Sequence, residues 1–262
     1  MLVPAPDPAL APVILASLAR ERLRQFRRAV PSGNNRAVLD LYVLDSELAS
    51  RFHAVFRVVE VTLRETMHRA LAAVFGPRWF SEPAFRSALD LRTLTAVDDA
   101  ARAGCPRGVI PPAGAVVAQL MFGTWVQVLA PGARRCQETA IWQPALAPAF
   151  QHAVVPGQAR GRAEVFELAQ RVNWARNRVN HCESVVFGFP LPGQITANRQ
   201  RRRATPHQVL DDARALVTAM NDQVAAWLDA WDELDALLAD AQVARALAFK
   251  DRDPGISLEG RR

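Results

Sequence analysis

The stretch R-N-R-V-N-H, residues 176–181, gathers side chains that could bind and cleave a phosphodiester. His181 can give or take a proton near neutral pH. Arg176 can hold a phosphate and neutralise the charge that builds on its oxygens during attack. Because RNA carries an internal nucleophile, its 2′-hydroxyl group, this pair of side chains fits cleavage of RNA without a metal ion.

This stretch lacks the residues that usually bind a catalytic metal ion. It has no pair of carboxylates and neither H-x-x-x-H nor H-E-x-x-H. The three cysteines, Cys105, Cys136 and Cys182, show no C-x-x-C spacing, so a zinc site is not expected either. An odd number of cysteines leaves one unpaired in any disulfide scheme, which favours a reducing compartment. We therefore expect no metal and no cofactor.

Polar side chains form one face of the helix that the pattern predicts from Val165 to about Val186. At about 100° per residue, six of them occupy a continuous arc of about 160°. They are Glu183, Arg176, Asn180, Asn173, Asn177 and His181. Asparagine is unfavourable inside a helix, so three asparagines beside an arginine and a histidine indicate a functional face. Cys182 falls on the opposite, apolar arc and is expected to pack.

Arg176 and His181 do not meet on an ideal helix. They are five residues apart, so their directions diverge by roughly 140° and they could not both reach one small phosphate. Either the helix is distorted or ends there, or a second copy of the chain completes the site.

The elements that must position this face are predicted to be helical. From Asp45 the apolar residues recur in steps of three and four until Gly76-Pro77, which predicts one long amphipathic helix. The same steps recur from about Pro206 to Phe249, with a largely acidic outer face. A basic helix is expected from about Pro12 to Val30. No segment alternates with period two, so the expected fold is all α.

Two smaller features bear on packing. Glu60 and Arg64 are four residues apart with the carboxylate first, the favourable order for an ion pair on a helix. In F-G-T-W, residues 122–125, a glycine lies between two aromatic residues, which indicates close packing of elements.

The chain is basic, with a net charge of +6 and a pI near 10.4, and Lys250 is its only lysine. Arginine suits phosphate or carboxylate, so an anionic partner is one explanation, and an arginine-biased genome is the other. The N-terminal apolar stretch is interrupted by four prolines and precedes the first arginines, the wrong order for a secretory signal. No apolar run reaches the roughly 18–20 residues that span a bilayer, so we expect a cytoplasmic protein.

The motif residues resemble those of a known superfamily. Arg-Asn followed by three residues and His, here 176–181, is similar to the R-x4–6-H motif of HEPN proteins. The wider string R-N-R-V-N-H-C-E resembles the Abi (abortive infection) family, where it typically reads R-N-R-I-A-H-H-E. Two further stretches resemble that family in the same order: V-V-E-V-T-L-R-E at 58–65 with G-P-R-W-F at 76–80, and F-G-T-W at 122–125. The resemblance covers about residues 40–190.

The resemblance implies a HEPN-type helical bundle and a metal-independent endoribonuclease that acts in phage defence or as a toxin. It also implies a symmetric homodimer in which two Arg176/His181 sets face each other. Asn177 would orient this pair, and Glu60 and Arg64 would support it from the neighbouring helix. The chain departs from the family pattern at Asn180 and Cys182, which replace an alanine and a second histidine.

These expectations define three parts of the chain: an arm and basic helix over 1–35, the HEPN/Abi-like domain over 36–195, and a basic run with the long C-terminal helix over 196–262. The last part would pack on the same domain or at a dimer interface. Supporting residues of the site are Glu60, Arg64, Asn180 and Glu183, and the residues expected to bind RNA are Arg178, Arg199, Arg201, Arg202 and Arg203. A protein or RNA antitoxin is a possible further partner.

Two alternatives stay open. Some HEPN proteins bind RNA or partners without cutting, and His181 would then be structural. The chain could also be a helical scaffold whose acidic C-terminal helix binds a protein, with the asparagine face filling a buried polar network.

Overall fold

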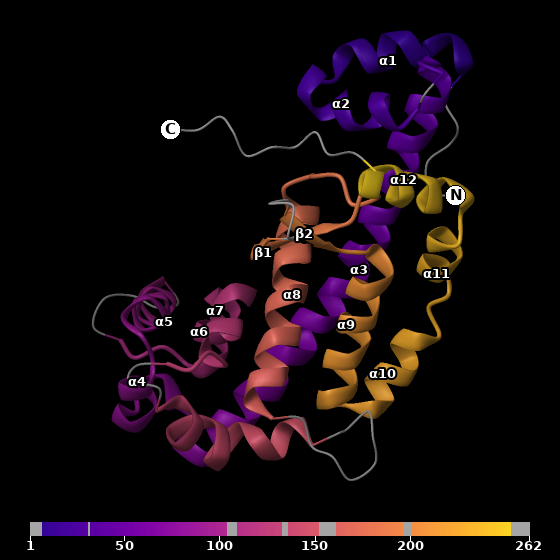
Figure 1. The fold of residues 1–262 in the computed structure, drawn as a ribbon. Helices are drawn as coiled ribbons and strands as arrows, with labels where there is room; N and C mark the ends of the chain where they lie inside the picture. Colours follow the sequence, from indigo (N-terminus) through magenta and orange to yellow (C-terminus); the bar gives the residue numbers. More distant parts are fainter. Residues whose placement is uncertain are drawn as a thin grey trace. The chain divides into compact units, whose positions relative to one another are not determined.

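Helices make up most of the computed structural model, which describes residues 7–30, 32–103, 109–132, 136–151, 161–195 and 201–252 (Figure 1). The expected all-α class is confirmed. In chain order the elements are η1 Pro8–Leu10, α1 Ala11–Ser17, α2 Arg20–Ala29, α3 Asn35–Phe75, η2 Trp79–Ser81, α4 Pro83–Ala88, α5 Leu91–Ala103, α6 Ala113–Gln119, α7 Phe122–Val128, a π-helix Glu138–Leu146, η5 Ala147–Phe150, α8 Arg162–Asn180, β1 Phe189–Ile195, β2 Arg201–Ala204, α9 Pro206–Met220, α10 Asp222–Asp229, α11 Glu233–Leu238 and α12 Ala241–Arg252.

Contacts divide the chain into two compact units. The first unit comprises residues 1–54, 174–210 and 231–262, and the second comprises 55–173 and 211–230. Three of the four boundaries fall inside α3, α8 and α9, so these helices contribute residues to both units, and the fourth lies between α10 and α11.

The long amphipathic helix is confirmed as α3, which begins earlier than the predicted start at Asp45. Asn34 caps it, because its side-chain oxygen accepts the N–H of Arg36 at 2.8 Å. The predicted apolar stripe is buried, and its least exposed members are Leu48, Phe52, Val55, Phe56, Val59, Leu63, Met67 and Leu71. Val74, at the end of the stripe, departs from the pattern and is 47% exposed.

The prediction of a single basic helix from Pro12 to Val30 is wrong, since the structure has two helices there, α1 and α2. The backbone is extended at Leu18 and Ala19, which interrupts the helical hydrogen bonds. Each short helix then buries its own apolar residues, Leu15 in α1 and Phe26 in α2. No proline or glycine marks this break in the sequence.

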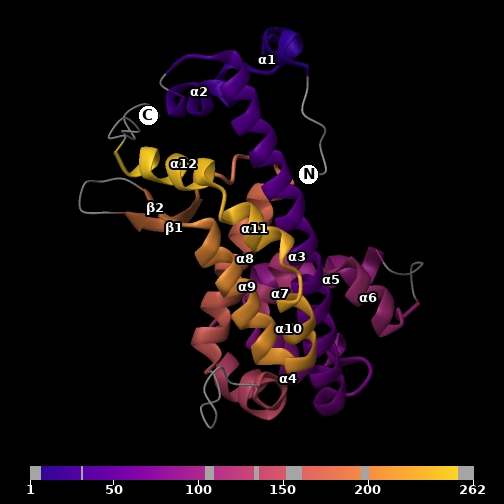
Figure 2. The same cartoon turned by 90° about the vertical axis from the view of Figure 1, so that its right-hand side faces the viewer.

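The single long helix expected from Pro206 to Phe249 is also wrong, because four helices, α9 to α12, occupy this segment (Figure 2). Asn221 has an extended backbone, and its side chain accepts the N–H groups of Gln223 and Val224, both at 3.0 Å. Such a local bond offers the backbone an alternative to the continuous helix. Trp227, which the predicted seam would bury, is 55% exposed.

A two-stranded antiparallel hairpin is the one departure from helix and coil among the described residues. β1 and β2 belong to the first unit and pair Phe189 with Ala204 and Pro190 with Arg203. Gly188 precedes β1 with a φ of +79°, and a Cβ there would come 2.7 Å from the carbonyl oxygen of Ala204. Only glycine fits this approach.

Aromatic side chains form the core of the second unit. The ring of Trp79 lies 5.7 Å from that of Trp125 and 5.0 Å from that of Phe85, and the indole N–H of Trp79 donates to Nδ1 of His68 at 3.0 Å. A Cβ at Gly123 would lie 3.6 Å from the side-chain nitrogen of Asn173. Phe122 and Trp125 are completely buried, which confirms the packing role predicted for residues 122–125.

Candidate active site

Four of the predicted site residues, Arg176, Asn177, Arg178 and Asn180, lie at the C-terminal end of α8, and His181 follows directly. The helix ends at Asn180, earlier than the expected Val186. Two hydrogen bonds close its end: the N–H of Cys182 donates to the carbonyl of Val179 at 2.9 Å, and the N–H of Glu183 donates to that of Arg178 at 3.0 Å. This is the Schellman arrangement. On a continuous helix the side chains of Arg176 and His181 would point in different directions. The end of the helix between them is one of the three solutions expected from the sequence, beside a distorted helix and a second copy of the chain.

Cys182 occupies a backbone conformation that normally belongs to glycine. Its φ is +54°, the only positive value for a residue other than glycine in the described chain. A side chain there costs about 1–2 kcal/mol. Cys182 is exposed, so the expectation that it packs is wrong. The reason is that the helical arc, on which that expectation rested, stops two residues earlier.

Amide side chains hold the guanidinium of Arg176. Its Nη1 donates to Oδ1 of Asn177 at 3.2 Å. When the Asn180 amide is oriented with its oxygen toward Arg176, that oxygen lies 3.3 Å from Nε and 3.2 Å from Nη1. His181 is exposed, and its backbone N–H donates to the carbonyl of Asn177 at 2.9 Å. The last turn of α8 thus presents an amide-held arginine and, at its end, an exposed imidazole.

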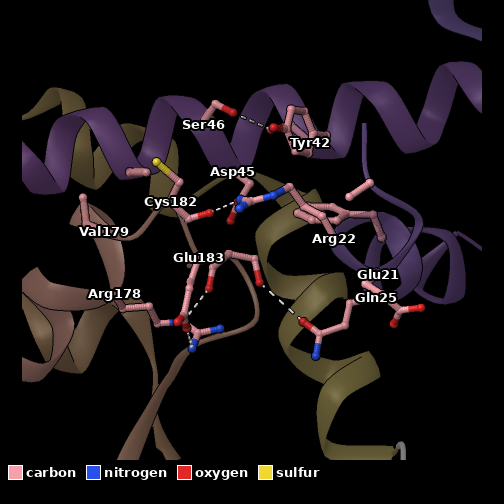
Figure 3. Close-up of a pocket in the computed structure, with 14 residues that line it drawn as sticks. Glu21, Arg22, Gln25, Tyr42, Asp45, Ser46, Arg178, Val179, Cys182 and Glu183 are labelled. Carbon is pink, nitrogen blue, oxygen red and sulfur yellow. Dashed lines mark hydrogen bonds and ion pairs between the residues drawn. The ribbon is translucent and has the colours of Figure 1, made fainter. Parts of the chain in front are cut away.

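Side chains from distant parts of the first unit fix the turn at residues 182–188 that follows His181. Oδ1 of Asp45 accepts the N–H groups of Val185 and Val186, both at 2.7 Å. Arg22 in α2 donates to the carbonyl of Cys182 (Figure 3).

Two further arginines bind carbonyls of the same turn. Nε of Arg178 donates to the carbonyl of Ser184, and Nε of Arg203 donates to that of Phe187, each at 2.8 Å. Local spacing gave no signal for Asp45 or Arg22, because the contacts join residues about 140 or more positions apart.

Burial sets the electrostatics of this turn. It raises the pKa of Asp45 to about 6, against the two backbone hydrogen bonds and the positive charges of Arg178 and Arg22. It also lowers the pKa of Arg203 to about 10, helped by the positive charge of Arg178. The pKa of Arg178 itself is lowered by burial and sustained by Glu183, with which it forms an ion pair.

The residues expected to bind RNA are placed differently from one another. Arg178 and Arg203 direct hydrogen bonds to backbone carbonyls of the turn, a structural use of their guanidinium groups. Arg202 is exposed in β2, and Arg201 lies in the same strand. Arg199 lies outside the described residues. Glu183, a predicted supporting residue, pairs with Arg178.

The two other supporting residues lie in the second unit. Glu60 and Arg64 form the expected ion pair, with 2.9 Å between Oε1 and Nη2, and both side chains are largely buried. Asn173, at the start of the predicted polar arc, also belongs to the second unit, and its Oδ1 is buried with no hydrogen-bond partner among the described residues. The arc is therefore not one uniform exposed face.

A cavity of about 620 Å³ adjoins the end of α8 within the first unit (Figure 3). It is lined from α2 by Glu21, Arg22, Gln25 and Phe26, from α3 by Tyr42, Asp45, Ser46 and Ala49, and from the end of α8 and its turn by Arg178, Val179, Cys182, Glu183 and Ser184, with Ala19 beside α2.

Comparisons with known proteins give no relative: no family model, no curated protein and no solved structure matches the chain.

Within the described ranges, no helix is long and apolar enough to cross a membrane. Nor do the described residues bring together three or more histidine, cysteine, aspartate or glutamate side chains in a way that could hold a metal ion.

Proposed function

We propose that this protein is a metal-independent endoribonuclease of HEPN type that acts in phage defence or as a toxin. The observation that carries the proposal is the end of α8, where two asparagine amides hold Arg176 and the exposed His181 follows immediately. Arginine and histidine at one helix end supply an anion-binding group and a proton-transfer group. The similarity of residues 176–183 to the Abi motif supports the same function.

The proposed reaction needs no cofactor. His181 accepts the proton of the RNA 2′-hydroxyl, whose oxygen attacks the adjacent phosphorus, and the bond from phosphorus to the 5′-oxygen breaks. Arg176 neutralises the charge that develops on the non-bridging oxygens. The departing 5′-oxygen takes a proton from the protonated histidine of a second copy or from water. The products carry 2′,3′-cyclic phosphate and 5′-hydroxyl ends.

The supports of this end suit a preorganised site. Because the turn after His181 is fixed by bonds to Asp45 and Arg22, the backbone that carries the imidazole is held without help from substrate. Because α8 ends at Asn180, the side-chain direction of His181 is not set by the helical repeat of α8. A homodimer would bring two such ends to one substrate.

The test is incubation of total bacterial RNA with purified protein in EDTA. Wild type should cleave, and His181→Ala should lower the rate by at least about 10²-fold, the usual contribution of a positioned acid or base. His53→Ala is the matched control, because His53 is also an exposed histidine of the first unit and lies outside this site. Equal cleavage by His181→Ala and wild type, or RNA that stays intact with wild type, would contradict the proposal.

A further inference from the structure

The cavity beside the end of α8 is lined by more carboxylates than guanidinium groups. Three carboxylates line it, those of Glu21, Asp45 and Glu183, against the guanidinium groups of Arg22 and Arg178. Both guanidinium groups also donate to partners within the turn, to the carbonyl of Cys182 and to Glu183. A phosphate would meet net repulsion here, whereas a group rich in N–H donors would be attracted.

Asp45 is the most deeply placed of these acceptors. The residue is 7% exposed, and its Oδ1 accepts the N–H groups of Val185 and Val186. Oδ2 is therefore the atom of this carboxylate that can accept from a bound group. The carboxylate favours a partner that supplies N–H groups, because the two backbone N–H groups satisfy only one of its two oxygens.

One wall of the cavity is aromatic. The rings of Phe26 and Tyr42 meet edge to face with 5.4 Å between their centres. Both residues line the cavity, but Phe26 is only 1% exposed, so Tyr42 supplies the accessible aromatic surface. A volume of about 620 Å³ is within the range of roughly 300–1,000 Å³ typical of small-ligand sites and accommodates a nucleoside. The site thus suits a flat, donor-bearing ring.

The cavity also lies next to the proposed catalytic residue in the sequence. Cys182 and Glu183, which line it, directly follow His181, and all three belong to the first unit. A base held there would be attached to a phosphate close to the end of α8.

We propose that this cavity binds the guanine base of the nucleotide next to the cleaved phosphate. Guanine presents two adjacent donors, N1–H and N2–H, which point in the same direction, so that Oδ2 of Asp45 can accept from both, and the ring acceptors O6 and N7 suit Arg22. Adenine and cytosine each place an acceptor beside their amino group, which a carboxylate repels, and uracil has a single ring donor between two carbonyls. This inference rests on the proposed RNA cleavage and gives it a base preference.

Equilibrium binding tests the inference without requiring cleavage. The probes are 2′-O-methyl hexauridylates with one central guanine, adenine or cytosine, which cannot react because they lack the 2′-hydroxyl nucleophile. Wild type should bind the guanine hexamer about tenfold or more tightly than the others, the discrimination expected of one pair of specific hydrogen bonds to a base edge.

Two variants locate the binding. Asp45→Asn keeps an oxygen that accepts from Val185 and Val186 but turns an amide donor to the base, so the guanine preference should disappear. Asp40→Asn is its matched control, since Asp40 lies on the same helix and does not line the cavity. Ala49→Leu narrows the cavity without changing its charge and should weaken guanine binding.

Each outcome decides the inference separately from the proposed function. Guanine preference that both cavity variants remove would support the cavity as a base site even if the RNA of a cleavage assay stayed intact. Equal binding of the three hexamers, no binding of any of them, or a guanine preference that survives both variants would overturn it, even if the protein cleaves RNA.

Discussion

Two helix ends in this protein use the same left-handed backbone in different ways. α3 ends before Gly76, whose φ is +81°, and α8 ends before Cys182, whose φ is +54°. At Gly76 the residue type itself removes the steric penalty, and the next bond is local, from the N–H of Trp79 to the Gly76 carbonyl. At Cys182 the penalty is retained.

The difference lies in what holds each end. Side chains of four residues of the first unit form hydrogen bonds with this turn: Arg22, Arg178 and Arg203 donate to its carbonyls, and Asp45 accepts from its N–H groups. Such tertiary bonds can outweigh about 1–2 kcal/mol of backbone strain. Strained backbone that its surroundings fix is often found at functional sites, which agrees with the role proposed for His181.

Removal of the central support should have the largest effect on stability. Asp45→Ala leaves the N–H groups of two fully buried residues, Val185 and Val186, without their acceptor. We expect a loss of roughly 2–5 kcal/mol in the free energy of unfolding, measured by urea denaturation. Asp40→Ala removes a partly exposed ion pair with Arg36 and should lose no more than about 1 kcal/mol. Similar losses for the two variants would show that the turn is held by other contacts.

The ionisation of Asp45 should have the next largest effect. Its pKa is about 6 in the folded chain and near 3.9 unfolded, so the folded state binds the proton more tightly. This contribution to stability is fully present below about pH 4 and is lost as the pH rises through 6, a change of roughly 3 kcal/mol.

Asp45→Asn does not titrate and should lack this contribution. The free energy of unfolding of wild type, relative to Asp45→Asn, should therefore fall between pH 4 and pH 7.5. Urea denaturation of both proteins across this range measures it. A relative stability of wild type that rises with pH would mean that hydrogen bonds to the ionised carboxylate outweigh its burial.

At the other helix end, Gly76→Ala should cost about 1–2 kcal/mol. A Cβ at Gly76 would meet no atom within 4 Å, so the loss would come from backbone conformation alone. Gly114→Ala is the matched control: a Cβ there also meets nothing, but Gly114 lies within α6 at an ordinary φ, where alanine should stabilise slightly. Thermal denaturation of both variants measures the difference. Equal changes in melting temperature would show that the positive φ of Gly76 does not cause the loss.

Cys182→Gly should have the smallest effect. Glycine relieves the left-handed strain but gains entropy in the unfolded chain, so we expect a change between zero and about 1 kcal/mol of added stability. The carbonyl that Arg22 binds is retained, as is His181. A destabilisation of more than about 1 kcal/mol would indicate that the cysteine side chain makes a contribution that its exposure does not suggest.

Regular periodicity made much of the fold predictable. The buried stripe of α3 follows its three- and four-residue steps from Leu48 to Leu71, and the ion pair of Glu60 with Arg64 follows from their spacing. The four C-terminal helices were not predicted, because the apolar steps continue through Asn221 although its side chain caps a new helix there. The hairpin was hidden by prolines in β1, which obscure any alternation.

The candidate site was predictable only in part. Residue types singled out Arg176, Asn177 and His181, and the structure puts them at one helix end. Asp45 and Arg22 were missed, because their contacts with the turn depend on how distant segments fold together. For the same reason the structural role of Arg203 could not be separated from phosphate binding by its place in a basic run.

In the proposed reaction the RNA 2′-hydroxyl is the nucleophile and His181 is its proton acceptor. The most direct test maps one cut in a defined RNA, in EDTA, and repeats the assay with a single 2′-deoxynucleotide at that position, for wild type and His181→Ala. We predict that wild type leaves 2′,3′-cyclic phosphate and 5′-hydroxyl ends, that the deoxy substitution blocks this cut alone, and that His181→Ala cuts neither RNA. Cleavage of the deoxy position, or 5′-phosphate products, would contradict the account.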